Sequence, residues 1–319
     1  LSRADPFCII MEDTLMKRYE PAPGFSIPCA AMGCMRIADM DVRSLESLVM
    51  TALEGGVDFF DHADFYGDHQ SEVRFGQVLA ANPGLRDRMI VQSKCGIRTG
   101  FYDSSYEHIV TSAENSLRKL HTDHLDALLI HRPDALAEPE EIARAFRDLK
   151  ESGKVRYFGV SNHNPMQIEV LQQAVDGRLL FNQMQMSVVH TGMIDQGINV
   201  NTTFPGSVDR DGGVLEYCKL KKMVLQVWSP FQYGFIEGVF LDNPDFPEVN
   251  HMLDQMAEKY GVTKTAMAVA WLTRIPMMIQ VISGTTNPER MKQIIAGVNT
   301  QISREDWYAI YRAAGNRLP

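Results

Sequence analysis

The sequence predicts a (β/α)8 TIM barrel, and three observations support this fold class. Eight short, β-prone apolar segments alternate along the 319 residues with segments whose apolar residues recur at helical spacing. The strands follow one another at intervals of roughly 25 to 45 residues, which is typical of parallel α/β folds. A doubly wound open sheet is the competing architecture, but no G-x-G-x-x-G sequence follows the first strand. The length fits one barrel of about 250 residues with an N-terminal hairpin and extended loops.

The predicted strands are short apolar runs that end in polar or turn-forming residues. The clearest begins after a glycine pair and contains Val57, Phe59 and Phe60. Near-continuous apolar runs such as residues 125–131 are typical of parallel strands that are buried on both faces. Residues 25–37 are predicted to form a short hairpin plus the first strand, and the other seven strands are predicted in residues 56–61, 89–94, 125–131, 155–160, 179–184, 223–228 and 278–283.

Helices are predicted between these strands from apolar residues at helical spacing and from terminal residues that suit a cap. Pro165 suits the first turn of one helix, and Ser303 suits the N-cap of the last. Residues 190–213 and 231–247 show no period, so long irregular loops are expected there. The helices are predicted in residues 41–55, 71–81, 106–120, 139–151, 165–174, 214–221, 249–260, 263–274, 288–296 and 303–314.

Composition excludes several classes of partner. The net charge is −9 and no Lys/Arg-rich run is present, which argues against nucleic acid or an anionic membrane. No apolar run approaches the roughly 20 residues of a membrane span. Five cysteines without C-x-x-C spacing indicate reduced thiols in a cytoplasmic protein, not a zinc site or a disulfide framework; they are Cys8, Cys29, Cys34, Cys95 and Cys218.

The first residues do not fit the barrel pattern. Residues 1–17 are interpreted as an N-terminal extension that is vector-derived or frame-shifted before Met11, and residues 18–319 as the barrel domain.

Side chains suited to chemistry follow successive predicted strands. Each alone is weak evidence, because a Lys or His at a strand end is usually solvated or structural and Asp61 could simply hydrogen-bond the backbone of its turn. In a parallel barrel, however, the carboxyl ends of the strands meet at the face where active sites lie. In chain order these ends carry Asp61 and Tyr66, Lys94, His131, Ser161 and Asn162, Gln183, Trp228 and Ser229, and Gly284 and Thr285.

Three of these segments resemble the aldo-keto reductase family. They are residues 58–67 (DFFDHADFYG), 93–94 (SK) and 128–134 (LLIHRPD). The resemblance runs from about residue 26 to residue 296, and the Arg-Pro-Asp and Trp-Ser-Pro segments are most similar to the bacterial oxidoreductase branch. It implies an NADPH-dependent reductase of aldehydes or ketones whose catalytic tetrad is Asp61, Tyr66, Lys94 and His131.

The resemblance also implies a role for each member of the tetrad. The cofactor supplies a hydride, so the protein has to position the carbonyl and protonate its oxygen. A free tyrosine has a pKa of about 10, and the Lys94 ammonium is expected to lower the pKa of Tyr66 and so make it a better acid. Asp61 would hold Lys94 charged and oriented, and His131 would hydrogen-bond the carbonyl of the substrate.

The remaining strand ends are expected, by the same resemblance, to contact the cofactor. Ser161, Asn162 and Gln183 would bind the nicotinamide carboxamide. Trp228 would stack on the nicotinamide ring, although a place in the barrel core is its alternative. Ser229 would meet the pyrophosphate, and the other expected contacts are Phe231, Gly284, Thr285 and, for the adenosine 2′-phosphate, Arg290.

Cofactor preference and substrate stay open. Gly284 stands where many relatives have a lysine, and Gln293-Ile294 departs from the usual adenine-contacting pair, so NADPH is expected but NADH is not excluded. The substrate is expected to be a small carbonyl compound chosen by the loops. Aromatic and methionine side chains that could line an apolar pocket for it are Phe65, Tyr102, Met186, Phe231, Tyr233 and Phe235.

Two other functions were weighed against the reductase. A metal-dependent barrel hydrolase could use Asp61, His62, Asp64, His69 and His131 as ligands, but His62 follows Asp61 directly and would point to the opposite side of the strand, so no metal is expected. A non-catalytic, cofactor-sensing subunit of a membrane complex is the other alternative. The sequence leaves the oligomeric state open.

Overall fold

The computed structural model describes residues 16–319, and its eight parallel barrel strands confirm the predicted (β/α)8 fold. The closed barrel has the order β3-β4-β5-β8-β9-β10-β11-β14, so the strands lie in chain order around it. The barrel strands are β3 (Ala30–Gly33), β4 (Phe59–Asp61), β5 (Ile90–Cys95), β8 (Leu125–Ile130), β9 (Val155–Ser161), β10 (Phe181–Gln185), β11 (Val224–Trp228) and β14 (Ile279–Ser283).

Helices follow the strands as the apolar periodicity predicts. Several begin at a side-chain cap: Asp41 accepts the backbone N–H of Ser44, Ser105 accepts that of His108, and Ser303 accepts that of Asp306. The α-helices of the described chain are α1 (Val42–Glu54), α2 (Gln70–Ala81), α3 (Tyr106–Leu120), α4 (Pro139–Glu151), α5 (Pro165–Ala174), α6 (Gly192–Ile198), α7 (Val214–Lys221), α8 (Pro247–Tyr260), α9 (Lys264–Thr273), α10 (Pro288–Asn299) and α11 (Arg304–Ala313).

The chain packs as two compact units. The first-half unit consists of residues 31–183 and 284–288. Of the described residues, the second-half unit consists of 16–30, 184–283 and 289–319.

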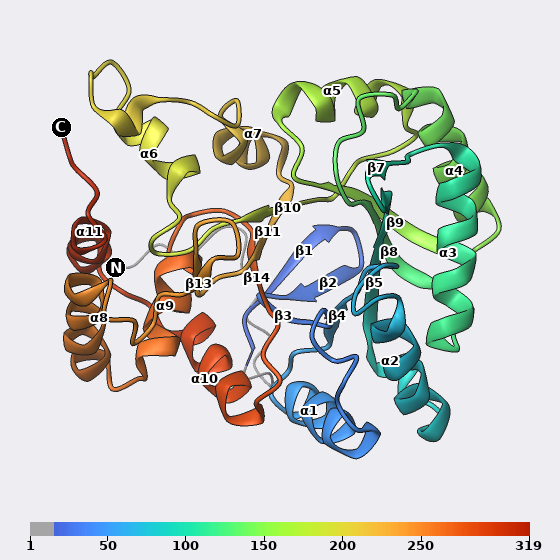
Figure 1. Cartoon of the computed structure of the whole chain (residues 1–319), viewed down its shortest axis with the longest axis horizontal. Helices are drawn as coiled ribbons and strands as arrows, with labels where there is room; N and C mark the ends of the chain where they lie inside the picture. The colour runs from blue at the N-terminus through green and yellow to red at the C-terminus, as the bar shows by residue number, and fades with distance from the viewer. Residues whose placement is uncertain (1–15) are drawn as a thin grey trace. The chain divides into compact units, whose positions relative to one another are not determined.

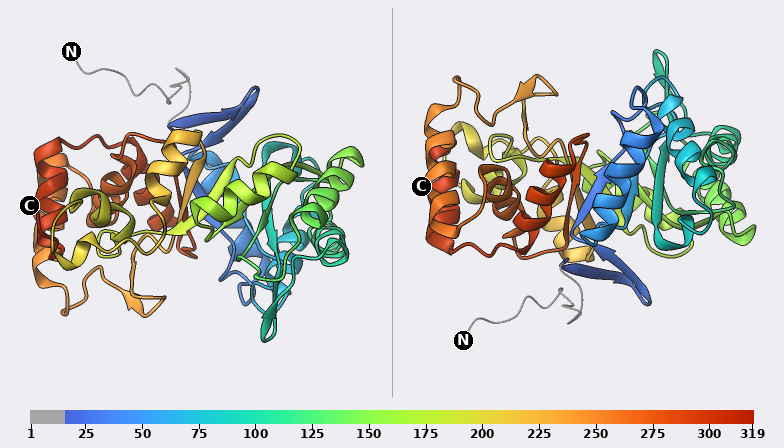
Figure 2. Two further views of the ribbon diagram at one scale, coloured as in Figure 1. Left: turned by 90° about the horizontal axis from the view of Figure 1, so that it is seen from above. Right: turned by 90° about the horizontal axis from the view of Figure 1, so that it is seen from below.

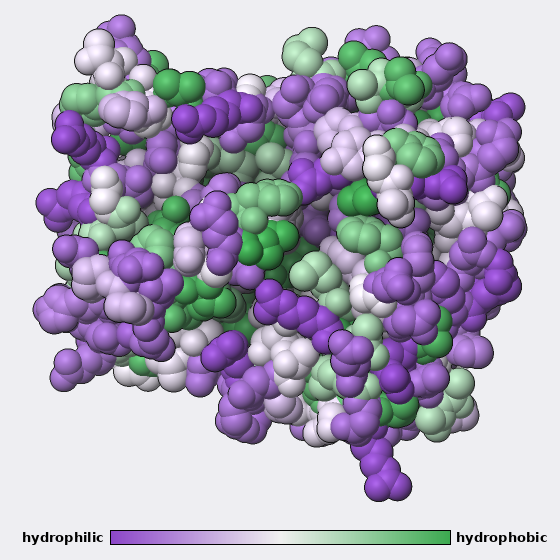
Figure 3. Space-filling model, in the orientation of Figure 1, coloured by the Kyte–Doolittle hydropathy of each residue, from purple (hydrophilic) through white to green (hydrophobic). Residues whose placement is uncertain are grey.

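The first-half unit is a layer of parallel strands covered by helices. Strand β4 pairs with β5, β5 with β8, and β8 with β9, while α2, α3, α4 and α5 pack side by side in that order (Figure 1). Helix α4 turns its apolar side toward the strands, and Phe146 stacks on Phe158 of β9 with ring centroids 4.1 Å apart. Over the outer side of α3 and α4, hydrophilic residues predominate (Figure 3). The amphipathic pattern therefore positions these helices.

In the second-half unit, two tryptophans join α9 to α11. The Trp271 and Trp307 rings stack with centroids 4.9 Å apart, and each indole N–H donates to the backbone carbonyl of the other residue at 3.0 Å. Helix α11 also packs against α8, and both views of Figure 2 show these two helices side by side. Buried Trp side chains contribute a large apolar area and need a partner for the N–H, and this reciprocal arrangement provides both.

Four features differ from the sequence-based expectation. Helix α6 lies inside residues 190–213, where an irregular loop was expected. Short hairpins β6–β7 (Ile97–Arg98 and Phe101–Tyr102) and β12–β13 (Gln232–Tyr233 and Gly238–Val239) were not predicted. The N-terminal hairpin begins earlier than expected, because it pairs β1 (Arg18–Ala22) with β2 (Phe25–Pro28).

Some expectations fall wholly or partly outside the described residues. Most of the N-terminal extension and Cys8 lie within residues 1–15, which the structure does not describe. The four cysteines of the described part are buried thiols: Cys29, Cys34, Cys95 and Cys218. Among the helices of residues 16–319, none combines the length and the apolar character that crossing a membrane requires.

Gly76 provides a test of the packing between α2 and α3. A Cβ atom at this position would overlap the backbone carbonyl oxygen of Lys119. Alanine normally stabilises a helix by about 1 kcal/mol relative to glycine, but here we expect Gly76→Ala to lower the free energy of unfolding by roughly 1 to 3 kcal/mol. Urea denaturation followed by circular dichroism measures this change.

Gly192 is the matched control for Gly76. It lies at the start of α6, and a Cβ atom there would have no neighbour within 4 Å. Gly192→Ala is expected to change the free energy of unfolding by no more than about 0.5 kcal/mol. Equal effects of the two substitutions would contradict the account of the α2–α3 contact.

Candidate active site

The centre of the candidate site is a buried ion pair between Asp61, the last residue of β4, and Lys94 of β5. The Lys94 Nζ atom lies 2.6 Å from Asp61 Oδ1, and the exposed fractions of the two side chains are 0% and 2%. The ammonium also donates to the His62 carbonyl oxygen at 2.8 Å. Burial lowers the pKa of Lys94, whereas Asp61 acts against this lowering. The pair thus keeps a positive charge in a place that would otherwise disfavour it.

Tyr66 lies in the turn after β4, beside this pair. The Lys94 Nζ atom is 5.0 Å from the centroid of the tyrosine ring. Burial of the side chain, and then the negative charge of the Asp61 carboxylate, raise the pKa of Tyr66 well above its ordinary value. The expectation that this pKa is lowered is therefore wrong for the net effect, because burial and the Asp61 carboxylate both raise it.

His131 directly follows β8 and contacts the same tyrosine. Its ring meets the Tyr66 ring edge-on with centroids 5.8 Å apart, and the Phe65 ring is 5.2 Å away. Burial, followed by the positive charges of Lys94 and Arg132, lowers the pKa of His131 well below its ordinary value. The imidazole is therefore neutral at neutral pH. Its buried Nδ1 atom has no hydrogen-bond partner among the described residues.

The three residues expected at the nicotinamide carboxamide lie next to the tetrad. Gln183 Nε2 donates to Asp61 Oδ1 at 3.1 Å. The Ser161 hydroxyl donates to the Gln183 carbonyl oxygen at 2.9 Å, and Asn162 Nδ2 donates to the His131 carbonyl oxygen at 3.3 Å. Asn162 has a positive φ of 59°, a conformation that asparagine tolerates better than most residues. These contacts link the ends of β8, β9 and β10 to Asp61.

Gln92 is a residue of this network to which the sequence analysis gave no role. Its side chain is fully buried, and Nε2 donates to Asp61 Oδ1 at 2.6 Å. A signal for it was present in the sequence, because residues two apart in a strand point to the same side and Gln92 precedes Lys94 by two positions.

The other expected cofactor residues lie at the predicted strand exits. In the first-half unit, Gly284 directly follows β14, and Thr285 Oγ1 accepts the backbone N–H of Asn287 at 3.1 Å. In the second-half unit, Trp228 ends β11 and meets Phe235 edge-on with ring centroids 6.1 Å apart. The remaining three are Ser229, Phe231 and Arg290. The Ser229 hydroxyl donates to Gln232 Oε1, and Arg290 is exposed in the first turn of α10.

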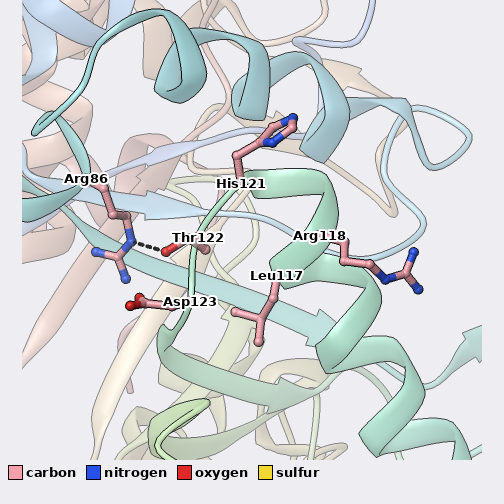
Figure 4. A pocket seen from close by; sticks show the side chains of 6 residues that line it. All are labelled: Arg86, Leu117, Arg118, His121, Thr122 and Asp123. Atoms are coloured by element: carbon pink, nitrogen blue, oxygen red, sulfur yellow. Dashed lines mark hydrogen bonds between the residues drawn. The ribbon is translucent and has the colours of Figure 1, made fainter.

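A shallow pocket in the first-half unit lies at the opposite ends of the strands (Figure 4). It is lined by residues that precede β5 and β8, among them Arg86 and Thr122, whereas the candidate site follows these strands. The Arg86 guanidinium donates to Thr122 Oγ1 at 3.0 Å, to the His124 carbonyl oxygen at 2.9 Å and to Asp126 Oδ2 at 2.8 Å. These bonds tie the segment before β5 to the connection between α3 and β8 and to β8 itself, so the arginine stabilises the fold at this end.

The residues considered for a metal site do not converge. The His62 ring is buried edge-on against Phe75 of α2, with centroids 4.6 Å apart, and burial lowers its pKa to about 3. It therefore lies on the helix side of the strand, as expected from its place next to Asp61. Within residues 16–319 no group of three or more His, Cys, Asp or Glu side chains is arranged to hold a metal ion.

The ion pair generates a prediction about stability. Replacing one partner leaves the other charge buried without its counterion, so Lys94→Met and Asp61→Asn are each expected to lower the free energy of unfolding by about 3 to 5 kcal/mol. The double variant should lose clearly less than the sum of the two, because no charge remains. Urea denaturation of the four proteins measures the coupling, and strictly additive losses would contradict a direct pair.

The chain is similar to known proteins over most of its length. The model of the Aldo/keto reductase family matches residues 31–314. Oxidoreductase YdhF of Escherichia coli is 37% identical over 295 residues, which cover 89% of this chain and 92% of that protein. A 6-dehydroglucose reductase of Agrobacterium fabrum is 34% identical, with 87% of this chain and 90% of that protein covered.

The fold is also similar to solved structures. The crystal structure of an aldo-keto reductase from Klebsiella pneumoniae in complex with NADPH superposes with a TM-score of 0.73 at 23% identity, covering 92% of this chain and 93% of that one. The matching family model and the two relatives above 30% identity agree with the resemblance found in the sequence, and the chain belongs to the aldo/keto reductase family.

Proposed function

We propose that this oxidoreductase reduces aldehydes or ketones to alcohols with NADPH, and that Tyr66 donates the proton. The observation that supports this most is the buried Asp61–Lys94 pair beside Tyr66 and His131. It combines a proton donor, a positive charge and a neutral hydrogen-bonding ring at the ends of adjacent strands. The cysteines of the described residues are thiols, which suits the reducing, cytoplasmic compartment that we propose.

The residues next to the tetrad suit the nicotinamide group of such a cofactor. A carboxamide has one acceptor oxygen and two donor hydrogens, and Ser161, Asn162 and Gln183 offer hydroxyl and amide groups of both kinds. When bound, NADPH supplies the hydride for the carbonyl carbon. Trp228, Ser229, Phe231, Gly284, Thr285 and Arg290 are proposed as further contacts from their likeness to the family pattern, and NADH is left open as a second cofactor.

Tyr66 and Lys94 would act together on the carbonyl oxygen. The raised pKa of Tyr66 keeps its hydroxyl protonated at neutral pH, which a general acid requires. As the proton leaves, negative charge develops on the tyrosine oxygen. The Lys94 ammonium is close enough to stabilise that charge, and Asp61 keeps the ammonium in place.

His131 would orient the carbonyl group. A neutral imidazole carries one N–H, and a buried N–H without an acceptor is rarer in proteins than an unused lone pair. Because Nδ1 is buried without a partner in the described structure, we assign the hydrogen to Nε2. The Nε2–H would then donate to the same oxygen that Tyr66 protonates.

The substrate class is proposed from the relatives. The 6-dehydroglucose reductases of Agrobacterium fabrum and Novosphingobium aromaticivorans are 34% and 33% identical to this chain. Aldehydes derived from sugars are therefore the first substrates to test, beside an activated aromatic aldehyde as a general carbonyl substrate.

Tyr66→Phe tests the proton donor. We expect kcat to fall by about 10² to 10⁴-fold because the hydroxyl is lost, while NADPH binds with unchanged affinity. The decrease of NADPH absorbance measures turnover, and the quenching of tryptophan fluorescence measures binding.

Tyr106→Phe is the matched control for this variant. The Tyr106 hydroxyl donates to Asp148 on the exposed side of α3, so its removal should leave kcat unchanged. A Tyr66→Phe protein with near-normal turnover would remove Tyr66 from the proposed role.

Arg290→Ala tests the preference for NADPH. A hydrogen-bonded arginine–phosphate contact is worth roughly 1.5 to 3 kcal/mol, so the Kd of NADPH should rise at least tenfold, whereas the Kd of NADH should stay the same. Arg304→Ala, at an exposed arginine of α11, is the control. Equal NADPH affinity in wild type and Arg290→Ala would contradict the assignment.

A further inference from the structure

Gln92 is placed by the sheet directly beside Asp61. The Cα atoms of the two residues are partners in the β4–β5 register, and the Gln92 carbonyl oxygen accepts the backbone N–H of His62 at 2.8 Å. Gln92 and Lys94 lie on the same side of β5 because they are two residues apart. The strand thus presents an amide and an ammonium to one carboxylate.

Three donors meet at a single oxygen of that carboxylate. Asp61 Oδ1 accepts from Lys94 Nζ at 2.6 Å, from Gln92 Nε2 at 2.6 Å and from Gln183 Nε2 at 3.1 Å. All four side chains are at most 2% exposed. A buried carboxylate needs several hydrogen bonds to remain charged, and three converging donors also determine its rotation about the Cβ–Cγ bond.

The amide of Gln92 supplies such a bond without adding a charge. A second cation in its place would compete with Lys94 for Asp61, and an apolar side chain would leave the carboxylate one donor short. The charged groups beside this amide are Asp61 and Lys94, and the Cys34 thiol lies close enough to both for their charges to affect its pKa. A neutral donor therefore preserves the one-to-one pairing of the two charges.

We propose that Gln92 is a positioning residue for carbonyl reduction: its amide holds Asp61 Oδ1 in the orientation that keeps Lys94 beside Tyr66. Gln92 acts through Asp61 and Lys94 and does not itself contact the substrate. The proposal rests on the proposed reductase function, and it adds to the tetrad a residue two positions before the lysine.

Two variants separate the hydrogen bond from the shape of the side chain. Gln92→Met keeps the length of glutamine but removes the donor, and we expect kcat to fall about tenfold while KM for the aldehyde and Kd for NADPH change less than about twofold. Gln92→Glu keeps the shape, but an ionised glutamate accepts only and repels Asp61, so a larger loss is expected at neutral pH.

The pH profile identifies the donor directly. A protonated glutamic acid regains an O–H donor, so the activity of Gln92→Glu relative to wild type should recover as the pH falls. The activity of Gln92→Met relative to wild type should not depend on pH, because methionine does not titrate. A structural defect alone would not produce this difference between the variants.

Gln226→Met and Gln226→Glu are the control variants. They measure the effect of burying a methionine or a glutamate in a barrel strand away from Asp61. Gln226 is buried in β11 and donates to Gln280 Oε1 at 2.8 Å. Both control variants should retain the kcat of the wild type, and urea denaturation of all five proteins identifies any effect that comes from lost folding.

The outcomes distinguish this inference from the proposed function. The inference is supported if the wild type reduces the aldehyde, Gln92→Met has a lower kcat, and Gln92→Glu has a still lower kcat that recovers as the pH falls. If the wild type reduces the aldehyde and Gln92→Glu is equally active, or if neither Gln92 variant loses activity, the role of Gln92 is overturned and the proposed function is not. A wild type that reduces no carbonyl compound would overturn the proposed function and this inference together.

Discussion

The buried contact between Asp61 and Lys94 is the constraint on which the candidate active site depends. Removing two charges from water is costly, and their mutual attraction compensates for this only with good geometry and further hydrogen bonds. Strands β4 and β5 provide both, because the register sets Asp61 opposite Gln92 and brings Lys94 to the same carboxylate. The His62 carbonyl oxygen and Gln183 complete the network. This part of the barrel interior therefore contains a hydrogen-bonded ion pair where apolar side chains would otherwise pack.

Burial, and then nearby charges, determine the protonation of the two neighbours of this pair. Burial and the positive charges of Lys94 and Arg132 keep His131 neutral, while burial and the Asp61 carboxylate keep Tyr66 protonated. A neutral imidazole and an intact phenol are both hydrogen-bond donors, and both suit the carbonyl oxygen of the proposed substrate. In the proposed reaction, the ammonium acts on Tyr66 when the phenol loses its proton. The net shift in the resting site is thus opposite to the shift that likeness to the family suggested.

Much of this arrangement could be predicted from the sequence, and the exceptions have physical reasons. The eight strands were found because runs such as Leu125–Ile130 are apolar and are followed by residues that stop a strand. Helix α6 was missed because Gly192 and Gly197 lie within its seven residues, where glycine disfavours a helix. The tetrad was proposed from its likeness to known motifs, whereas Gln92 matched no motif and its proposed role depends on the partner across the sheet. The pKa of Tyr66 depends on burial, which the order of residues does not reveal.

The central claim is that this site transfers a hydride from NADPH to a carbonyl carbon. The most direct measurement supplies NADPH that carries deuterium at the reactive C4 position and determines by mass spectrometry and NMR where the label lies in the alcohol. The account predicts one deuterium atom on the former carbonyl carbon, with the hydroxyl hydrogen taken from water. An alcohol without deuterium on that carbon would contradict hydride transfer, and the absence of any alcohol would contradict the reductase function.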